Sequence, residues 1–235
     1  MTAARTASRW QVFHYLWSSA VVGALLFNVF WPVYPGYSLW ALSLVAFPVA
    51  TALILANRPG NRVGRVLAVV ATSAAVTFVG GSLARAWQSQ AWSLYIEAGT
   101  AAAVPVIFWG AMTLLYIFPT GVVVNRSFRL AFIAFTVFVV LMAVPAPFDP
   151  GPMPLTARPN PLAGPAWVGS FYDYGLFVLV PGLVGGVWAT ISRFRSATRE
   201  IRTQLRWFMA GAVAVVGLVL VVLSFPIRCR HRTKS

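Results

Sequence analysis

The feature that most limits what this chain can fold into is a series of apolar runs, each about as long as a membrane-spanning helix. A helix needs roughly 20 mostly apolar residues to cross the hydrocarbon core of a bilayer. Charged residues make up only 9% of the chain, against about 25% in soluble domains. The sequence therefore predicts an all-α integral membrane protein with about seven transmembrane helices. The runs lie near residues 15–33, 39–56, 66–83, 95–118, 130–146, 171–191 and 207–225.

Basic residues in the connections between the runs predict an orientation. With residues 1–14 in the cytoplasm, twelve arginines fall on that side, and the outer loops receive only Arg85 and Arg158. Because cytoplasmic loops carry the excess of Lys and Arg, we expect a multi-pass protein of the plasma membrane with a cytoplasmic N-terminus. The net charge of +14 then reflects topology and a lipid bilayer partner, and nucleic acid is not an expected partner. The twelve are Arg5, Arg9, Arg58, Arg62, Arg65, Arg126, Arg129, Arg193, Arg195, Arg199, Arg202 and Arg206.

The same scheme divides the chain into three parts. We expect a cytoplasmic N-terminal segment (1–14), a transmembrane helical module (15–226) and a basic tail (227–235). The first run exceeds the apolar core of about 7–15 residues in a signal peptide, so we interpret it as an uncleaved span. The basic tail would lie outside the cell after seven spans, against the orientation rule. Either the seventh run is not a full span, or the tail is a truncation or frameshift scar.

No pattern in the sequence predicts an enzyme or a cofactor. Glycine-rich phosphate-binding motifs are absent, and no His or Cys set has the spacing of a metal site. Ser43, Ser73 and Thr77 lie in apolar runs without a base to activate them. We therefore expect no catalytic residue, no cofactor and no metal in this chain.

Three ionisable residues near the outer ends of the predicted spans are candidates for a ligand or proton site. They are Arg85, Glu97 and Asp173, and ionisable groups at membrane depth are functional hypotheses by default. The alternative is that water and headgroups solvate the two carboxylates at the helix ends.

A second group of candidates is basic. Arg195, Arg199, Arg202 and Arg206 recur every three or four residues, which predicts one helical face. Anionic lipid headgroups are the natural partner of such a face, and a cytoplasmic coupling helix is the second interpretation. A charge cluster that only sets topology is the third. Nearby, Gly182 and Gly186 form a small-xxx-small pair suited to close helix contact.

Short segments in the connections occur in a recognisable order. They are Arg58-Pro59-Gly60-Asn61-Arg62-Val63-Gly64, Phe118-Pro119-Thr120-Gly121 with Arg126-Ser127-Phe128-Arg129, Asn160-Pro161-Leu162, Arg193-Phe194-Arg195, and Glu200-Ile201-Arg202-Thr203-Gln204-Leu205-Arg206-Trp207. The ordered set resembles the N-terminal membrane-sensing region of actinobacterial sensor histidine kinases of two-component systems. There the second segment typically reads F-P-D/T-G-R-x-P and the last R-F-R followed by E-R-x-Q-L-R-W. This chain departs from the pattern at Val122, where a basic residue is usual, and at Arg62, where proline is common.

The resemblance implies a sensory input module for signal transduction, usually homodimeric, that is followed in its family by a further span and then a cytoplasmic kinase domain. No counterpart of that domain occurs within the 235 residues, so the chain is not expected to be an enzyme. The resemblance also implies a kinase partner, and an accessory membrane protein that binds a separate kinase is one alternative. A small membrane transporter or channel subunit is the other.

Overall fold

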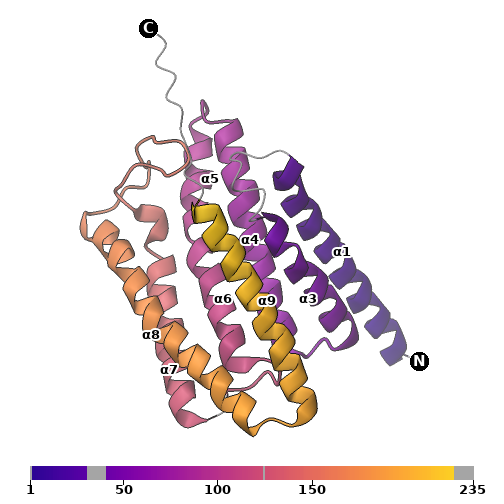
Figure 1. Ribbon diagram of the computed structural model, residues 1–235. Helices are drawn as coiled ribbons and strands as arrows, with labels where there is room; N and C mark the ends of the chain where they lie inside the picture. The colour runs from indigo at the N-terminus through magenta and orange to yellow at the C-terminus, as the bar shows by residue number, and fades with distance from the viewer. Residues whose placement is uncertain (1, 31–40, 124, 225–235) are drawn as a thin grey trace.

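The computed structural model describes residues 2–30, 41–123 and 125–224, and helices dominate this part of the chain (Figure 1). No strand occurs among these residues, and one isolated β-bridge joins Pro152 and Pro159. The all-helical prediction is therefore confirmed for the described residues. The helices are α1 (Thr2–Phe30), α3 (Ala46–Asn57), α4 (Arg62–Ala86), α5 (Trp92–Ala101), α6 (Ala103–Ile117), α7 (Arg126–Ala143), a 3₁₀ turn η1 (Ala146–Phe148), α8 (Trp167–Ser196) and α9 (Arg199–Ser224).

Within the described residues, three helical segments are long and apolar enough to cross a membrane. They are Arg62–Ala86, Trp92–Ile117 and Arg126–Phe148, which match the third, fourth and fifth predicted runs. On α7 the outward face is apolar, as expected of a helix in contact with lipid rather than water. The exposed large side chains on that face are Leu130, Ile133, Val137, Val140 and Leu141.

Helix starts and stops follow local sequence signals. Asn61 and Asn125 are extended residues whose side chains accept hydrogen bonds from the backbone N–H of Gly64 (3.1 Å) and Phe128 (2.9 Å), which caps α4 and α7. α6 ends before Pro119, as expected because the residue before a proline disfavours helix. The fourth predicted run is divided at Ala102 into α5 and α6.

Two predicted boundaries lie near the ends of the chain. Helix α1 is continuous from Thr2 to Phe30, so the predicted N-terminal segment 1–14 is helical together with most of the first predicted run. No proline or glycine interrupts residues 2–14, so no breaker ends the helix there. The predicted basic tail and the end of the seventh predicted run, at residue 225, lie outside the described residues.

Small residues let the helices approach closely. A Cβ added at Gly110 of α6 would stand 2.1 Å from Cγ2 of Val70 on α4, and one at Gly182 of α8 would stand 2.4 Å from Cδ2 of Phe135 on α7. Because such distances are far below van der Waals contact, only glycine fits at both positions. Gly182 thus makes the close contact that its spacing predicts, within one molecule.

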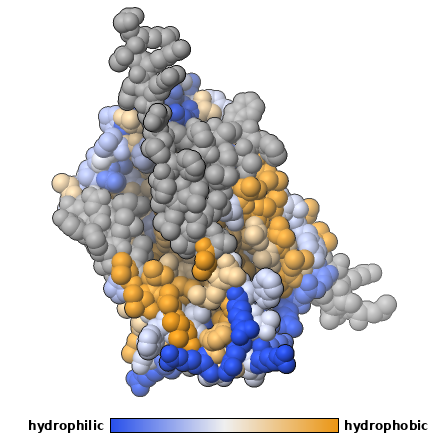
Figure 2. All heavy atoms as spheres, viewed as in Figure 1, coloured by the Kyte–Doolittle hydropathy of each residue, from blue (hydrophilic) through white to orange (hydrophobic). Residues whose placement is uncertain are grey.

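The bundle has two distinct ends. One, the arginine-rich end, holds the connections α3–α4, α6–α7 and α8–α9, and Figure 2 shows hydrophilic residues gathered there below an apolar band. The other, the loop end, holds residues 147–166 beside α5. Helix α4 contacts α1, α3, α5 and α6, and α6 also contacts α7 and α8. α9 packs mainly on α8.

Candidate functional site

The most unusual group at the arginine-rich end is Arg193, on the last turn of α8. Its side chain is only 6% exposed. Its guanidinium donates hydrogen bonds to the backbone carbonyls of Tyr116 (2.5 Å), Phe118 and Val122 (3.2 Å). One buried cation therefore holds the end of α6 and the loop that follows it against α8.

The carbonyls explain why a cation can be buried here. The last carbonyls of a helix have no partner within that helix, and the helix dipole places partial negative charge at the same point. Arg193 satisfies these groups without a carboxylate. Burial lowers the pKa of the Arg193 guanidinium from its ordinary value, yet an arginine side chain stays protonated in proteins.

Helix α9 joins this junction through an aromatic pair. The rings of Phe118 and Phe208 are stacked, with centroids 4.4 Å apart and planes inclined by 17°. Leu205, one turn earlier on α9, is fully buried. Because the Phe118 carbonyl also accepts a hydrogen bond from Arg193, Phe118 connects α6, α8 and α9. We call Arg193, Phe118, Leu205 and Phe208 the three-helix junction.

The loop between α6 and α7 is shaped to reach this junction. Gly121 has φ of +77°, a conformation that costs glycine little and other residues more. Its N–H donates to the carbonyl of Ile117 (2.7 Å), which closes the end of α6. A Cβ added at Gly121 would stand 3.4 Å from Cβ of Arg62, so the first residue of α4 lies against the same loop.

The expectation of one continuous basic helical face is wrong. Ala197 is extended (ψ 150°) and ends α8, so Arg195 lies on α8 while Arg199, Arg202 and Arg206 lie on α9. All four are exposed. The Arg202 guanidinium donates to the carbonyl of Arg195 (3.3 Å), which brings the two helix ends together across the corner.

At the loop end, Glu97 and Arg85 meet on one residue of the connection. Glu97 is 2% exposed, and its two oxygens accept from the Leu155 N–H (2.6 Å) and the Thr156 hydroxyl (2.9 Å). Arg85 donates to the Leu155 carbonyl (3.1 Å). The buried carboxylate departs from the expectation of a solvated helix end, because the connection folds back over α5. We call Glu97, Arg85, Leu155 and Thr156 the loop latch.

Asp173 belongs to α8, and its side chain lies outside the described residues. The structure therefore does not test its predicted grouping with Arg85 and Glu97. Among the described residues, no group of three or more His, Cys, Asp and Glu side chains could hold a metal ion.

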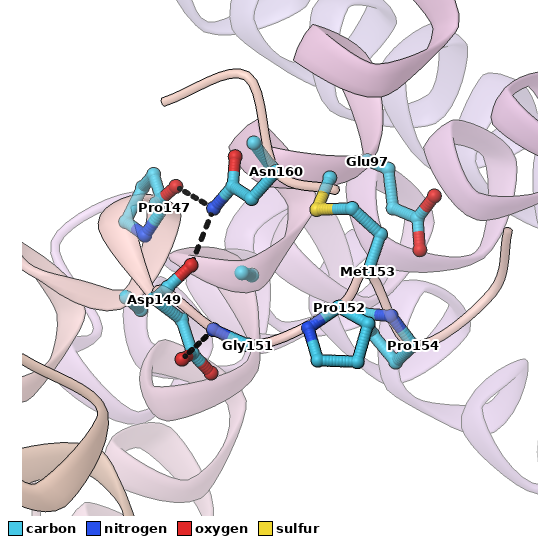
Figure 3. Close-up of a pocket in the computed structure, with 11 residues that line it drawn as sticks. Glu97, Pro147, Asp149, Gly151, Pro152, Met153, Pro154 and Asn160 are labelled. Carbon is cyan, nitrogen blue, oxygen red and sulfur yellow. Dashed lines mark hydrogen bonds between the residues drawn. The ribbon is translucent and has the colours of Figure 1, made fainter. Parts of the chain in front are cut away.

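Asn160 shapes the connection beside the latch. Its amide donates to the carbonyls of Pro147 (2.9 Å) and Asp149 (2.8 Å), and its oxygen accepts from the Leu162 N–H (2.9 Å). These bonds border a cavity of about 90 Å³ that Glu97 and Met153 also line (Figure 3). Ligand pockets usually measure about 300–1,000 Å³, so this space fits a few waters rather than a drug-sized molecule.

Sequence reasoning assigned Arg193 to the basic topology segment and missed its role in the junction. The one available signal was its place in Arg193-Phe194-Arg195, which follows Phe118-Pro119-Thr120-Gly121 in the ordered set of segments. Comparison with known proteins adds no further assignment: no family model, no curated protein and no solved structure matches the chain.

Proposed function

We propose that this chain is a membrane-embedded sensory input module, similar to the membrane region of actinobacterial sensor histidine kinases. In this proposal the chain spans the plasma membrane seven times and the arginine-rich end faces the cytoplasm. Two features support the orientation: the connections richest in arginine share one end of the bundle, and Lys and Arg are in excess in cytoplasmic loops. The module acts as a homodimer, as the resemblance implies.

The three-helix junction is the observation that carries the proposal. Phe118, Arg193 and Phe208 lie in or directly after three separate segments of the resemblance, and Phe118 contacts both of the others in the fold. Contact between segments far apart in sequence gives them a shared physical role.

The proposed mechanism follows from which helices the junction ties together. α9 leads away from the arginine-rich end, and its first turns are anchored by Leu205 and Phe208. A shift of α8 either carries the end of α6 and its following loop along with Arg193 or breaks the hydrogen bonds between them. Intermediate positions are disfavoured, because packed interfaces adopt discrete arrangements rather than deform continuously. α9 then moves with Phe118, and it passes the change to a cytoplasmic output domain through the further span that the resemblance implies.

Hydrogen exchange on the full chain in lipid nanodiscs tests this transmission. Glu97→Leu breaks the loop latch, and we expect exchange in residues 117–122 and 199–208 to change by about fivefold, which corresponds to a coupling free energy near 1 kcal/mol. Gln90→Leu, an exposed polar residue at the same end, is the matched control and should leave the junction unchanged. Adding Arg193→Met to Glu97→Leu should abolish the transmitted change. Faster hydrogen exchange confined to residues 150–160 after Glu97→Leu would contradict the proposal.

An accessory protein that binds a separate kinase would use the same junction. Co-purification distinguishes this accessory role from that of an input module with its own output domain. Translation of the locus in all frames past codon 235 shows whether an output domain is encoded with the module. A histidine kinase co-purifying from native membranes, lost on Phe208→Ala, favours the accessory role instead.

The transporter or channel alternative has weaker support. Both carboxylate oxygens of Glu97 are bonded within the chain, and the adjoining cavity is about 90 Å³. Ion flux in proteoliposomes that depends on Glu97 or Asp173 would nevertheless establish it in place of the sensory role.

A further inference from the structure

Two arginines of α9 share one aromatic ring of α8. The Cζ atoms of Arg202 and Arg206 lie 6.0 Å and 5.9 Å from the centre of the Phe194 ring, within the range of a cation–π interaction. Phe194 thus restricts both guanidiniums to the neighbourhood of one surface point at the α8–α9 corner. Planar guanidiniums stacked on an aromatic ring keep their outer N–H groups free to bind phosphate.

Nothing in the described chain neutralises this pair of cations. Arg202 donates to the carbonyl of Arg195, and neither arginine forms an ion pair with a described acidic side chain, Glu200 included. Like charges four residues apart on a helix repel each other. An anion bound between them would remove this repulsion and form charge-assisted hydrogen bonds.

The surroundings indicate which anion. Trp207, next to Arg206 in sequence, is 76% exposed, and tryptophan is enriched where a helix crosses the membrane–water interface. From Met209 onward α9 is apolar, so acyl chains can lie along it while a headgroup reaches the corner. We propose that Arg202 and Arg206, held over Phe194, form a binding site for the phosphodiester headgroup of an anionic phospholipid.

Such a lipid would bind where α8 turns into α9, next to the three-helix junction, because Phe194 and Arg206 adjoin Arg193 and Leu205 in sequence. It would hold the angle between the two helices and make the position of α9 depend on the anionic lipid content of the membrane. This inference rests on the proposed membrane placement of α9, and it does not require the signalling role.

Native mass spectrometry of the detergent-purified full chain tests the site by titration with phosphatidylglycerol. We expect Arg202→Gln with Arg206→Gln to weaken binding about 30-fold, since each arginine near a lipid surface contributes about fivefold. The matched control is Arg126→Gln with Arg129→Gln, which removes two exposed arginines from the same end and should change affinity by less than about threefold. Equal losses in the two double variants would overturn the site, because charge number alone would then explain binding.

Three further arms make the test specific. Phosphatidylcholine should bind much more weakly than phosphatidylglycerol, and millimolar inorganic phosphate should not displace the lipid. Equal binding of phosphatidylcholine, or displacement by phosphate, contradicts an anionic lipid site.

Phe194→Leu keeps both charges but removes the ring, and we expect affinity to fall about fivefold; an unchanged affinity contradicts the role of the ring. If the double glutamine variant does not fold, Arg202→Lys with Arg206→Lys replaces it, with an expected loss of about fivefold because the planar fork is gone. All results are read in the purified chain, so they are independent of the Glu97→Leu transmission test.

Discussion

Among the described residues, each end of the bundle buries one charged side chain. Each charge is bonded to polar groups of a connection, but the two arrangements do different things. At the arginine-rich end, Arg193 donates to three carbonyls at the end of α6 and the turn after it, and so joins helices to one another. At the loop end, Glu97 accepts from a backbone N–H and a hydroxyl of a single connection, and so joins a loop to a helix.

The difference follows from the sign of the charge and from what lies opposite it. A helix C-terminus presents free carbonyls and partial negative charge, which a cation satisfies. A loop that folds back over a helix presents N–H groups, which a carboxylate satisfies. In a membrane, irregular backbone persists only where such groups are bonded, so each buried charge maintains the non-helical segment next to it.

The largest expected effect comes from breaking the arginine-rich end. Arg193→Met leaves three carbonyls without their donor, and we expect the free energy of unfolding to fall by about 3 kcal/mol. Reversible SDS unfolding in mixed micelles measures this change. Arg195→Met, which removes an exposed arginine two residues along the same helix, should cost less than about 0.5 kcal/mol. Similar losses in both variants would mean that Arg193 contributes only as a surface charge.

Breaking the loop end should cost less, because only one connection is released. Glu97→Leu leaves the Leu155 N–H and Thr156 hydroxyl without their acceptor, and we expect a loss of about 2 kcal/mol in the same unfolding assay. Amide exchange at Leu155 should accelerate. Glu200→Leu, at an exposed carboxylate, serves as the control and should change stability little. Unaltered exchange at Leu155 would show that the latch does not hold the loop.

A glycine substitution at each end sharpens the comparison of packing. A Cβ at Gly185 would stand 2.4 Å from the Tyr116 hydroxyl, which donates to the Gly182 carbonyl at 3.0 Å. We expect Gly185→Ala to cost about 1.5 kcal/mol, because the bonded hydroxyl has to move. Gly81→Ala meets only the tip of Leu155 at 3.0 Å, and its change should stay below about 0.5 kcal/mol, since that tip can rotate. Thermal melting of the two variants side by side measures the difference, and a larger loss for Gly81→Ala would reverse the comparison.

The smallest effect concerns the aromatic pair of each end. A double-mutant cycle with Phe118→Leu and Phe208→Leu should give a coupling of about 1 kcal/mol for the stacked rings. The same cycle on Trp87 and Trp92, whose rings are 5.5 Å apart, tilted by 48° and exposed, should give less than about 0.5 kcal/mol. Equal couplings would show that stacking does not distinguish the junction that anchors α9.

Much of the helical architecture followed from local patterns. The starts of α4 and α7 follow Asn61 and Asn125, and the end of α6 falls before Pro119, because caps and prolines act within a few residues. A connection between the sixth and seventh runs was predicted, but its position at residues 197–198 was not. Residues 197–198 contain neither glycine nor proline, and the regular spacing of arginines across them favoured a single helix.

Sequence alone determined the helical class and three segments able to cross a membrane, because apolar length is a property of consecutive residues and the bilayer sets the length required. It also singled out Arg85 and Glu97, because ionisable residues are rare in such a chain. Only the tertiary structure decided what these residues contact. Leu155 is 58 residues from Glu97, and Phe118 is 75 residues from Arg193. Helix packing determines these hydrogen-bond partners. The packing depends on close approaches at Gly110, Gly182 and Gly185, and no local sequence pattern shows which helix each of these glycines contacts.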